Sequence, residues 1–402
     1  MEVIKLKEYQ TYNIDNDNNL LKLEHYLKKN GLKNVLDIKY REVHSNSYVG
    51  FIKCHNLQIE ILPKLLSNDN DNFIIRNLIY MLSYTHKLDI HTNNTAILSN
   101  SKNPFLEILI SQFATSLFEN LKRQTPKEYI NICENLTYMK GKLDFSNQLR
   151  FNSANQAKCY CWYDEFSEDN NLNQLFLFLS TALYHISENY NTRKILKQII
   201  NLYQDITFKQ ITYDTVKNIK LSRNQKCFEK PFNLAKMFLK QSSIDFSKNR
   251  IENISLLWDM NVLFEEYVFE VMKRRCPKLK EITSQKGKRL LEDIESNRKT
   301  RNTFVDILIN KEIVLDTKYK IFEDESCFDN ADVFQVMTYC LLHKVKRAIL
   351  IYPQWDKDHK ISRKTYLNNG KNDYSIQFAT VNLRQDLKQH NIEKELMEIL
   401  NL

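Results

Sequence analysis

The sequence predicts an α+β protein of several domains: a small, mixed and mainly β N-terminal domain, a helical middle domain and a C-terminal α/β domain. The chain has 402 residues, which is long for one domain, and 43% of them are hydrophobic, which is enough for separate cores. The apolar pattern changes along the chain from short runs to helical periodicity, and then to strands alternating with helices. We place the domains at 1–95, 96–250 and 251–402.

The first region is predicted to be mainly β because its apolar runs are short and end at turn residues. The runs 47–52 and 57–62 are typical of strands, and Pro63 ends the second one. From Phe73 the spacing of apolar residues becomes helical. We therefore expect strands followed by a helix.

The middle region is predicted to be helical because three stretches have amphipathic periodicity. These stretches are 104–124, 171–189 and 193–204. The stretch 205–250 is polar and mixed, with weak strand signals only. We expect it to bridge to the last domain.

The C-terminal region alternates helices and strands. The expected elements are a helix at 255–275, a hairpin of strands at 303–309 and 312–319, a helix at 331–344, a strand at 347–352 stopped by Pro353, a strand at 375–383 and a helix at 384–401. The order of helix, hairpin, helix and strand is typical of an α/β domain.

Composition excludes several classes of site. The eight cysteines include no CxxC pair, so we expect neither a zinc site nor an iron–sulfur cluster. The five glycines are spaced wrongly for a P-loop or a Rossmann fingerprint. Any nucleotide hydrolysis must therefore come from another chain.

Charge and hydropathy point to the kind of partner. No apolar run approaches the roughly 18 residues of a membrane span, and the start lacks the features of a signal peptide. We therefore expect no membrane partner and a cytoplasmic location. The net charge of +9 suits a polyanion such as DNA.

The predicted hairpin carries the candidate chemistry. Nine residues separate Asp306 from Asp316, and Lys318 follows two residues later. Residues two apart on a strand project to the same side, so Asp316 and Lys318 point together. A short turn places Asp306 opposite Asp316 on the neighbouring strand. Two carboxylates and an ammonium group then share one face within apolar strands.

Such a grouping indicates a metal site. Two close carboxylates repel each other, and a divalent cation removes the conflict. Mg²⁺ prefers oxygen ligands, and its site can hold a water near a scissile phosphate. Lys318 would orient that water or neutralise charge on the phosphate. We predict Mg²⁺, with Mn²⁺ also accepted. The alternative is that these are solvated charges at strand ends.

Two flanking helices add candidates. Glu265 would bring a third carboxylate to the metal; the alternative is an exposed helix charge. Gln335 and Tyr339 lie on one helix face at i and i+4 and would hold the catalytic strand or a DNA phosphate. They also fit as ordinary helix residues. The catalytic candidates are Asp306, Asp316, Lys318, Glu265, Gln335 and Tyr339, and the metal ligands among them are Asp306, Asp316 and Glu265.

With these residues the chain resembles the PD-(D/E)xK nuclease superfamily. Asp306, Asp316 and Lys318 match its motif, although Val305 stands where proline is usual. Proline is not a ligand, so the departure leaves the chemistry intact. The segment 335–339 resembles the QxxxY element of the RecB-like branch.

A longer set of motifs resembles the McrC family. The matching elements are Gly50 with 59–64, 136–143, 163–169 with Asn173, 261–265 and 315–320. They occur in order over most of the chain and are more specific than the nuclease motif alone. The acidic residues Asp164, Glu165 and Asp169 of the third element have two open roles, at an interface or in capping and turns.

The resemblance implies a function. McrC-like chains are the nuclease subunits of McrBC-type, modification-dependent restriction systems. Each works with an McrB-like AAA+ GTPase hexamer, docks into it by its N-terminal part and stimulates GTP hydrolysis. We therefore expect a Mg²⁺-dependent endonuclease with DNA and such a hexamer as partners. Two alternatives are a non-catalytic activator of the AAA+ protein and a free-standing RecB-like repair nuclease.

Overall fold

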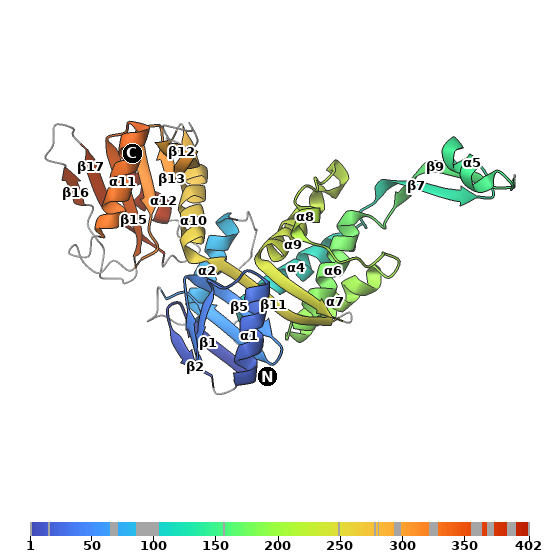
Figure 1. Ribbon diagram of the computed structural model, residues 1–402, viewed down its shortest axis with the longest axis horizontal. Helices are drawn as coiled ribbons and strands as arrows, with labels where there is room; N and C mark the ends of the chain where they lie inside the picture. Colours follow the sequence, from blue (N-terminus) through green and yellow to red (C-terminus); the bar gives the residue numbers. More distant parts are fainter. Residues whose placement is uncertain are drawn as a thin grey trace. The chain divides into compact units, whose positions relative to one another are not determined.

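The structure, a computed structural model, divides into two compact units. One contains Met1–Asn93 and Gln241–Leu402, and the other contains Asn94–Lys240 (Figure 1). The described residues are 2–14, 17–64, 71–85, 104–155, 157–247, 250–276, 279, 281–292, 299–320, 329–354, 364–367, 374–383 and 391–400. The regions expected to form separate first and last domains thus fold together.

A five-stranded sheet explains why the two ends of the chain share a unit. Its order is β1 (Glu2–Lys7), β6 (Leu57–Leu62), β5 (Tyr48–Cys54), β11 (Arg250–Asp259) and β10 (Ser242–Ser247). β11 pairs antiparallel with β5, from Asn253 opposite Cys54 to Asp259 opposite Tyr48. Residues 255–259, which the sequence analysis placed at the start of a helix, lie in this strand. That boundary prediction was wrong because an apolar run flanked by polar residues fits a buried strand equally well.

The helix α1 covers this sheet. The smaller elements of the region are α1 (Asp17–Lys29), β2 (Thr11–Asn13), β3 (Leu36–Lys39) and β4 (Glu42–Ser45), with the last three forming their own sheet in the order β2-β4-β3. Leu23 and Leu27 of α1 are buried against Ile52 and Ile59 in one hydrophobic core. Tyr26 at the same face donates to Ser255 Oγ at 3.1 Å, so α1 is also tied to β11.

The C-terminal part forms a six-stranded sheet. Its order is β12 (Ile282–Glu292), β13 (Lys299–Ile309), β14 (Ile313–Thr317), β15 (Arg347–Gln354), β17 (Ser375–Asn382) and β16 (Lys364–Leu367). β13 and β14 form the predicted antiparallel hairpin, and β14, β15 and β17 run parallel. Pro353 does not stop β15. β14 ends opposite Ile351, so the missing N–H of Pro353 costs no bond to that neighbour.

The helices of this part pack against the sheet or against one another. They are α2 (Asp71–Thr85), α10 (Met260–Arg275), α11 (Asn330–His343) and α12 (Asn391–Leu400). α11 packs on β14 and β15, while α12 packs on β17 and α10. Tyr267 of α10 contacts the rings of Tyr80 and Tyr84 of α2, so the helix predicted after Phe73 supports α10. Residues 384–390 of the predicted last helix lie outside the described residues.

The second unit contains the three predicted middle helices. They are α4 (Pro104–Leu121), α6 (Asn171–Ile186) and α7 (Tyr190–Leu202). The stretch 205–250 is not merely a bridge, because it also contains α8 (Tyr213–Val216), a 3₁₀ turn (Arg223–Phe228) and α9 (Glu229–Gln241). Phe232 and Phe238 of α9 are buried. Pro231 sits in the first turn of α9, where a missing N–H is tolerated.

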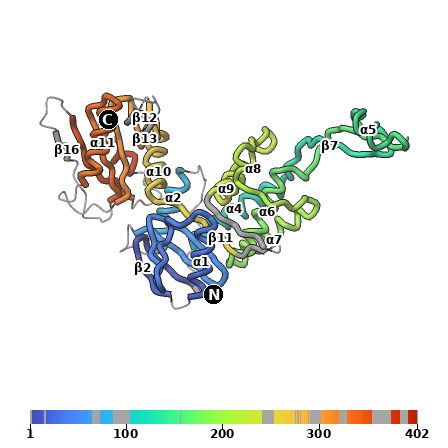
Figure 2. The backbone as a smooth tube through the Cα atoms, in the orientation of Figure 1, coloured from blue at the N-terminus to red at the C-terminus, as the bar shows by residue number. Residues whose placement is uncertain are grey.

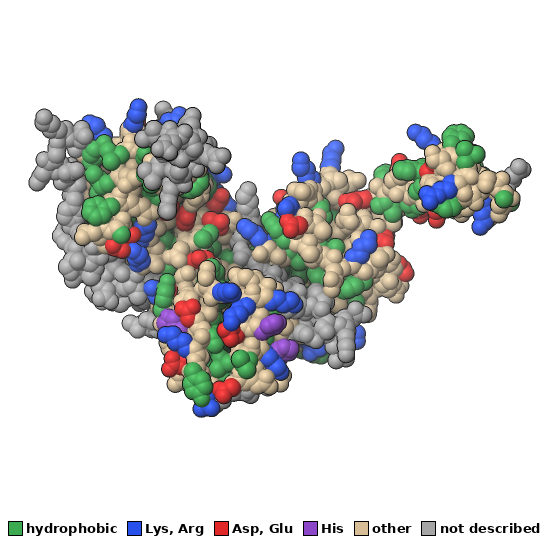
Figure 3. All heavy atoms as spheres, in the orientation of Figure 1, with side chains coloured by type: hydrophobic (Ala, Val, Ile, Leu, Met, Phe, Trp, Pro, Cys, Tyr) green, Lys and Arg blue, Asp and Glu red, His purple; other side chains and the backbone are tan. Residues whose placement is uncertain are grey.

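The same unit has an arm built on a three-stranded sheet, which the sequence analysis did not predict. β7 (Glu128–Leu136) and β9 (Cys159–Ser167) pair antiparallel, β8 (Lys142–Leu143) joins β9, and α5 (Phe145–Asn152) lies at the end away from the helices (Figure 2). We call residues 128–167 the arm. Its exposed apolar side chains are Tyr129, Tyr138, Met139, Phe145, Leu149, Phe151, Trp162 and Phe166 (Figure 3). A search of the described helices found none long and apolar enough to cross a membrane.

The shared five-stranded sheet generates a stability prediction. Gly50 has a φ of +132°, and a Cβ there would overlap the backbone oxygen of Leu256 in β11. Gly50→Ala should therefore lower the free energy of unfolding by more than about 2 kcal/mol, measured by chemical denaturation. Gly31→Ala is the control: its φ is +71° with no atom within 4 Å, so only the left-handed backbone penalty of roughly 1 kcal/mol applies. Equal effects of the two changes would contradict the close approach of β5 and β11.

Candidate functional site

The β13–β14 hairpin brings two aspartates face to face. Asn310 and Lys311 have φ values of +51° and +58°, as a tight hairpin turn requires. The pairing of Ile307 with Leu315 continues by one step to place Asp306 opposite Asp316, as predicted. Asp316 is fully buried, and Asp306 is half-buried. The site therefore begins as two carboxylates on neighbouring strands of a buried sheet.

The two carboxylates have different partners. Asp306 Oδ2 accepts from the Thr317 backbone N–H at 2.9 Å and from Thr317 Oγ1 at 3.1 Å. Asp316 Oδ2 forms an ion pair with Lys318 Nζ at 2.9 Å. Asp316 Oδ1 has no hydrogen-bond partner within the described part of the chain. An ionised carboxylate buried with one unpartnered oxygen is costly, and a cation would satisfy it.

Lys318 connects the hairpin to α11. Its Nζ donates to Gln335 Oε1 at 2.9 Å, and Gln335 Nε2 donates to Tyr339 Oη at 2.6 Å. The predicted pair on one helix face thus forms a chain of hydrogen bonds that ends on the lysine. This geometry suits the first of the two expected roles, which was to hold the strand that carries Asp316 and Lys318.

Burial dominates the electrostatics of the acidic residues. It raises the pKa of Asp316 to about 7, with the nearby Asp306 adding to the shift and Lys318 opposing it. Burial also raises the pKa of Asp306, while hydrogen bonds from Thr317 lower it. For Lys318, burial acts to lower the pKa, but Asp316, Asp332 and Asp306 together outweigh it and raise it. The lysine stays an ammonium group, and the paired aspartates resist full ionisation.

Asp332 is a buried acid that the sequence analysis missed. It lies on α11 with a side chain 8% exposed, at 3.8 Å from Lys318 Nζ and 3.0 Å from Lys320 Nζ. Tyr352 Oη donates to it at 3.5 Å. Asp332 is three residues before Gln335, so its position on the same helix face was a usable signal. Its burial was not visible in the sequence.

Glu265 is near the pair but has another partner. Its Oε1 accepts a hydrogen bond from Gln285 Nε2 of β12. Burial raises the pKa of Glu265 to about 7, and the charge of Asp306 adds to this rise. Glu265 is therefore close enough to sense Asp306 electrostatically, and the alternative of a fully exposed helix charge does not describe it. Gln285 was not predicted as part of the site.

Another buried acid, Glu8 of the N-terminal region, contacts the segment that carries Lys318. Glu8, which is 4% exposed, accepts from Tyr319 Oη at 3.2 Å and from the Lys64 backbone N–H at 3.0 Å. Tyr319 directly follows Lys318, and its ring lies 5.9 Å from the ring of Phe264, the neighbour of Glu265. Glu8 thus contacts the segment that carries Lys318, and Tyr319 of this segment also contacts the helix that carries Glu265.

The donor set fits a magnesium ion. All candidate ligands are carboxylate oxygens, and Asp316 Oδ1 is a buried acceptor without a hydrogen-bond partner in the described residues. No three acidic, histidine or cysteine side chains among those residues gather closely enough to hold an ion together. Mg²⁺ is commonly bound by one or two carboxylates with waters completing its shell. Asp306 and Asp316 meet that need, with Glu265 outside the immediate pair.

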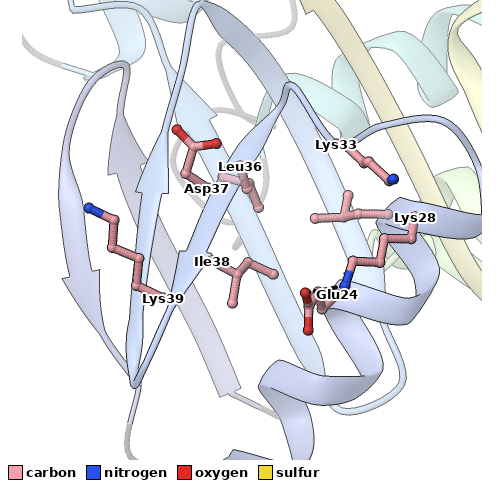
Figure 4. A pocket seen from close by; sticks show the side chains of 8 residues that line it. Glu24, Lys28, Lys33, Leu36, Asp37, Ile38 and Lys39 are labelled. Atoms are coloured by element: carbon pink, nitrogen blue, oxygen red, sulfur yellow. Dashed lines mark ion pairs between the residues drawn. The ribbon is translucent and has the colours of Figure 1, made fainter.

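The other hollows lie elsewhere. One depression of about 350 Å³ is bounded by α1 and β3, with Lys33 and Lys39 on its rim and an ion pair between Glu24 and Lys28 beside it (Figure 4). None of the predicted site residues lines it.

The acidic motif residues of the second unit lie outside the site as well. Asp169 accepts hydrogen bonds from Thr207 and Gln174. Of the two roles left open for these residues, an interface or a turn, this fits the turn. The motif residues Asp164 and Glu165 are exposed on β9 of the arm.

The fold and this site define a multidomain α/β protein with an acidic, lysine-bearing site on a mixed sheet. The chain belongs to the family described as McrBC 5-methylcytosine restriction system component, whose model matches residues 43–353. It is 21% identical over 359 residues to the type IV methyl-directed restriction enzyme EcoKMcrBC of Escherichia coli K12, covering 81% of this chain and 97% of that protein.

Two solved structures have a similar fold. A half-complex from a tetradecameric assembly of Thermococcus gammatolerans McrB AAA+ hexamers with bound McrC contains a chain with a TM-score of 0.73 and 21% identity, covering 99% of both chains. The cryo-EM structure of the Thermococcus gammatolerans McrBC complex matches with a TM-score of 0.53 and 24% identity, covering 69% of this chain and 89% of that chain. The predicted family resemblance is confirmed.

The pKa of Asp316 generates a prediction for the metal-free protein. A carboxyl whose pKa rises on folding binds its proton more tightly in the folded state, so its contribution to stability is greatest below about pH 4 and is lost as the pH rises through about 7. Asp316→Asn removes this loss. In EDTA, the melting temperature of the variant relative to wild type should increase between pH 5 and pH 8.

An exposed aspartate is the control for this measurement. Asp214 pairs with Lys217 at 2.7 Å, and its side chain is 82% exposed. Asp214→Asn should leave the difference from wild type nearly constant over the same pH range. A difference for Asp316→Asn that shrinks as the pH rises would contradict the raised pKa.

Proposed function

We propose that this chain is the endonuclease subunit of an McrBC-like restriction complex. It hydrolyses DNA phosphodiester bonds with Mg²⁺ at a PD-(D/E)xK nuclease domain built on β13 and β14, and it stimulates a partner AAA+ GTPase hexamer. The observation that carries the proposal is the buried Asp316 opposite the half-buried Asp306, with Lys318 Nζ 2.9 Å from Asp316 Oδ2. The family membership and the two similar folds support the partner.

The residues of the chain divide the chemical work. Asp306 and Asp316 would hold the ion, with Mn²⁺ as an acceptable substitute, and Glu265 would add a further carboxylate or hold a bound water. A bound Mg²⁺ supplies a Lewis acid for the phosphate and an acidified water as nucleophile. Lys318 Nζ donates to Gln335 Oε1 and lies 2.9 Å from Asp316 Oδ2 and 3.8 Å from Asp332 Oδ1. Its ammonium group would orient the attacking water or neutralise charge on a phosphate oxygen.

Gln335 and Tyr339 act behind the lysine. Because Gln335 Oε1 accepts from Lys318 and its Nε2 donates to Tyr339, the amide orients the ammonium group without adding charge. We therefore assign these two residues to holding Lys318, in preference to binding DNA phosphate directly.

The two alternative functions have less support. A non-catalytic activator has no need for a fully buried carboxylate opposite a half-buried one, whose cost is unexplained without a cation. A free-standing repair nuclease does not account for a family match that covers residues 43–353, most of which lies outside the candidate site.

The arm is a candidate docking surface for the AAA+ partner. Its end carries Tyr138, Met139, Phe145 and Leu149, which are 61–73% exposed. Clustered exposed apolar side chains are a feature of protein interaction sites. The earlier expectation placed docking within residues 1–95, which stays a prediction beside this one. The N-terminal part also stabilises the C-terminal part, because β5 pairs with β11 and Glu8 contacts Tyr319.

The metal proposal predicts a loss of cleavage with retained folding. Asp316→Ala should abolish cleavage of DNA by the complex because it removes a direct ligand, and Lys318→Ala should stop cleavage while metal binding persists. Cleavage should require Mg²⁺ or Mn²⁺, while Ca²⁺ should support binding but little cutting. Cleavage is followed on gels, metal binding by calorimetry and folding by circular dichroism. Full activity of Asp316→Ala, or a strict need for Zn²⁺, contradicts the site.

The docking proposal predicts that stimulation and cutting separate. The chain alone should not hydrolyse GTP, but it should stimulate hydrolysis by its AAA+ partner. Asp316→Ala should stimulate as wild type does, because the site and the arm belong to different compact units. Replacing Tyr138, Met139 and Phe145 together by Ser should reduce stimulation without changing the melting temperature.

A matched variant tests whether the effect belongs to the arm. Leu202 of α7 is 55% exposed, and Leu202→Ser should leave stimulation unchanged. If the triple arm variant stimulates GTP hydrolysis as wild type does, the arm is not the docking surface, and docking by the N-terminal part is favoured. A failure of Asp316→Ala to stimulate contradicts the separation of the two roles.

A further inference from the structure

We propose that Gln285 is a positioning residue that holds the Glu265 carboxylate at the Asp306–Asp316 pair. It belongs to β12, a strand that the sequence analysis did not predict, and its side-chain Nε2 donates to Glu265 Oε1. The inference rests on the proposed nuclease function, because positioning Glu265 has a purpose only if that carboxylate serves the metal site.

The strand register places Gln285 next to the site. In the antiparallel pairing of β12 with β13, Ser284 is opposite Ile307 and Lys286 is opposite Val305. Gln285 therefore stands across from Asp306, on the strand adjacent to the one that carries this carboxylate. Three neighbouring strands then contribute one polar residue each at the same level: Gln285, Asp306 and Asp316.

The backbone at Gln285 is unusual for a strand. Its φ is +51°, in the left-handed region that costs free energy for any residue with a side chain. Gly287, two residues along the same strand, would adopt this conformation at no such cost, yet it is not among the positive-φ glycines. Position 285 thus has a glutamine where glycine would adopt the backbone conformation at a lower cost in free energy. The other non-glycine residues with positive φ include Asn310 and Lys311 at the hairpin turn and Lys344 at the end of α11, whereas Gln285 lies within a strand and across from Asp306.

The chemistry of the amide suits this role. A lysine or arginine at the same place would neutralise Glu265 and compete with a cation for its oxygens. A neutral amide N–H fixes Oε1 and leaves the negative charge and Oε2 for the ion or a bound water. Burial and the charge of Asp306 both disfavour ionised Glu265, so a donor that stabilises the carboxylate has a clear effect here.

The test separates backbone strain from function because one substitution should change stability and DNA cleavage in opposite directions. Gln285→Gly removes the amide and also removes the left-handed penalty, so the melting temperature should stay equal or rise. DNA cleavage by the complex at limiting Mg²⁺ should fall roughly 10- to 100-fold, with half-maximal activity shifted to higher Mg²⁺. Lys344→Gly is the matched control, because Lys344 has a φ of +58° at the end of α11 and is not one of the candidate site residues. It should gain stability in the same way and cut as wild type does.

A double variant shows whether Gln285 acts through Glu265. If it does, Gln285→Gly added to Glu265→Gln should reduce cleavage little further, since the carboxylate that it holds is already lost. Two outcomes overturn the inference: wild-type Mg²⁺ dependence of Gln285→Gly, or a full additional loss in the double variant. An Asp316→Ala complex that still cuts overturns the proposed function itself, so the two failures are distinguishable.

Discussion

The burial of Asp306 opposite Asp316 is the constraint on which the C-terminal part of the structure depends. Two carboxylates inside a sheet are unfavourable, and burial raises the pKa of each. The hairpin turn fixes their register, so the chain cannot relieve the conflict by sliding one strand. Thr317 stabilises one acid with two hydrogen bonds, and Lys318 pairs with the other. One oxygen of Asp316 is left for a cation.

The strand that carries these groups is held from both sides. Lys318 and Lys320 face α11: Lys318 donates to Gln335, and Lys320 forms an ion pair with Asp332. Tyr319, between the two lysines, points the other way and donates to Glu8 of the N-terminal region. Alternating side chains of one short segment thus link a helix of the C-terminal part to the N-terminal sheet. This explains why the first 93 residues and the last 162 behave as one compact unit.

The elements with strong local signals could be predicted from the sequence, and those that depend on distant partners could not. The hairpin and its aspartates followed from two apolar runs and a turn. The second half of β11, residues 255–259, was predicted as helix because its apolar run forms a strand only by pairing with β5, about 200 residues earlier. The arm has few buried apolar residues and hence weak periodicity. Gln285 had no signal, because its role arises from a backbone conformation and the strand register.

The order of elements along the chain links the second unit to the candidate site. The second unit ends at Lys240, and the chain then enters β10, turns into β11 and reaches Asp259. Asp259 caps α10 by accepting from the Asn261 backbone N–H at 2.9 Å, and α10 carries Glu265. β11 is fixed on β5, so the start of α10 is set by the N-terminal sheet as well. The position of Glu265 therefore depends on the pairing of β11 with β5, whereas the two aspartates are fixed by a hairpin turn of their own.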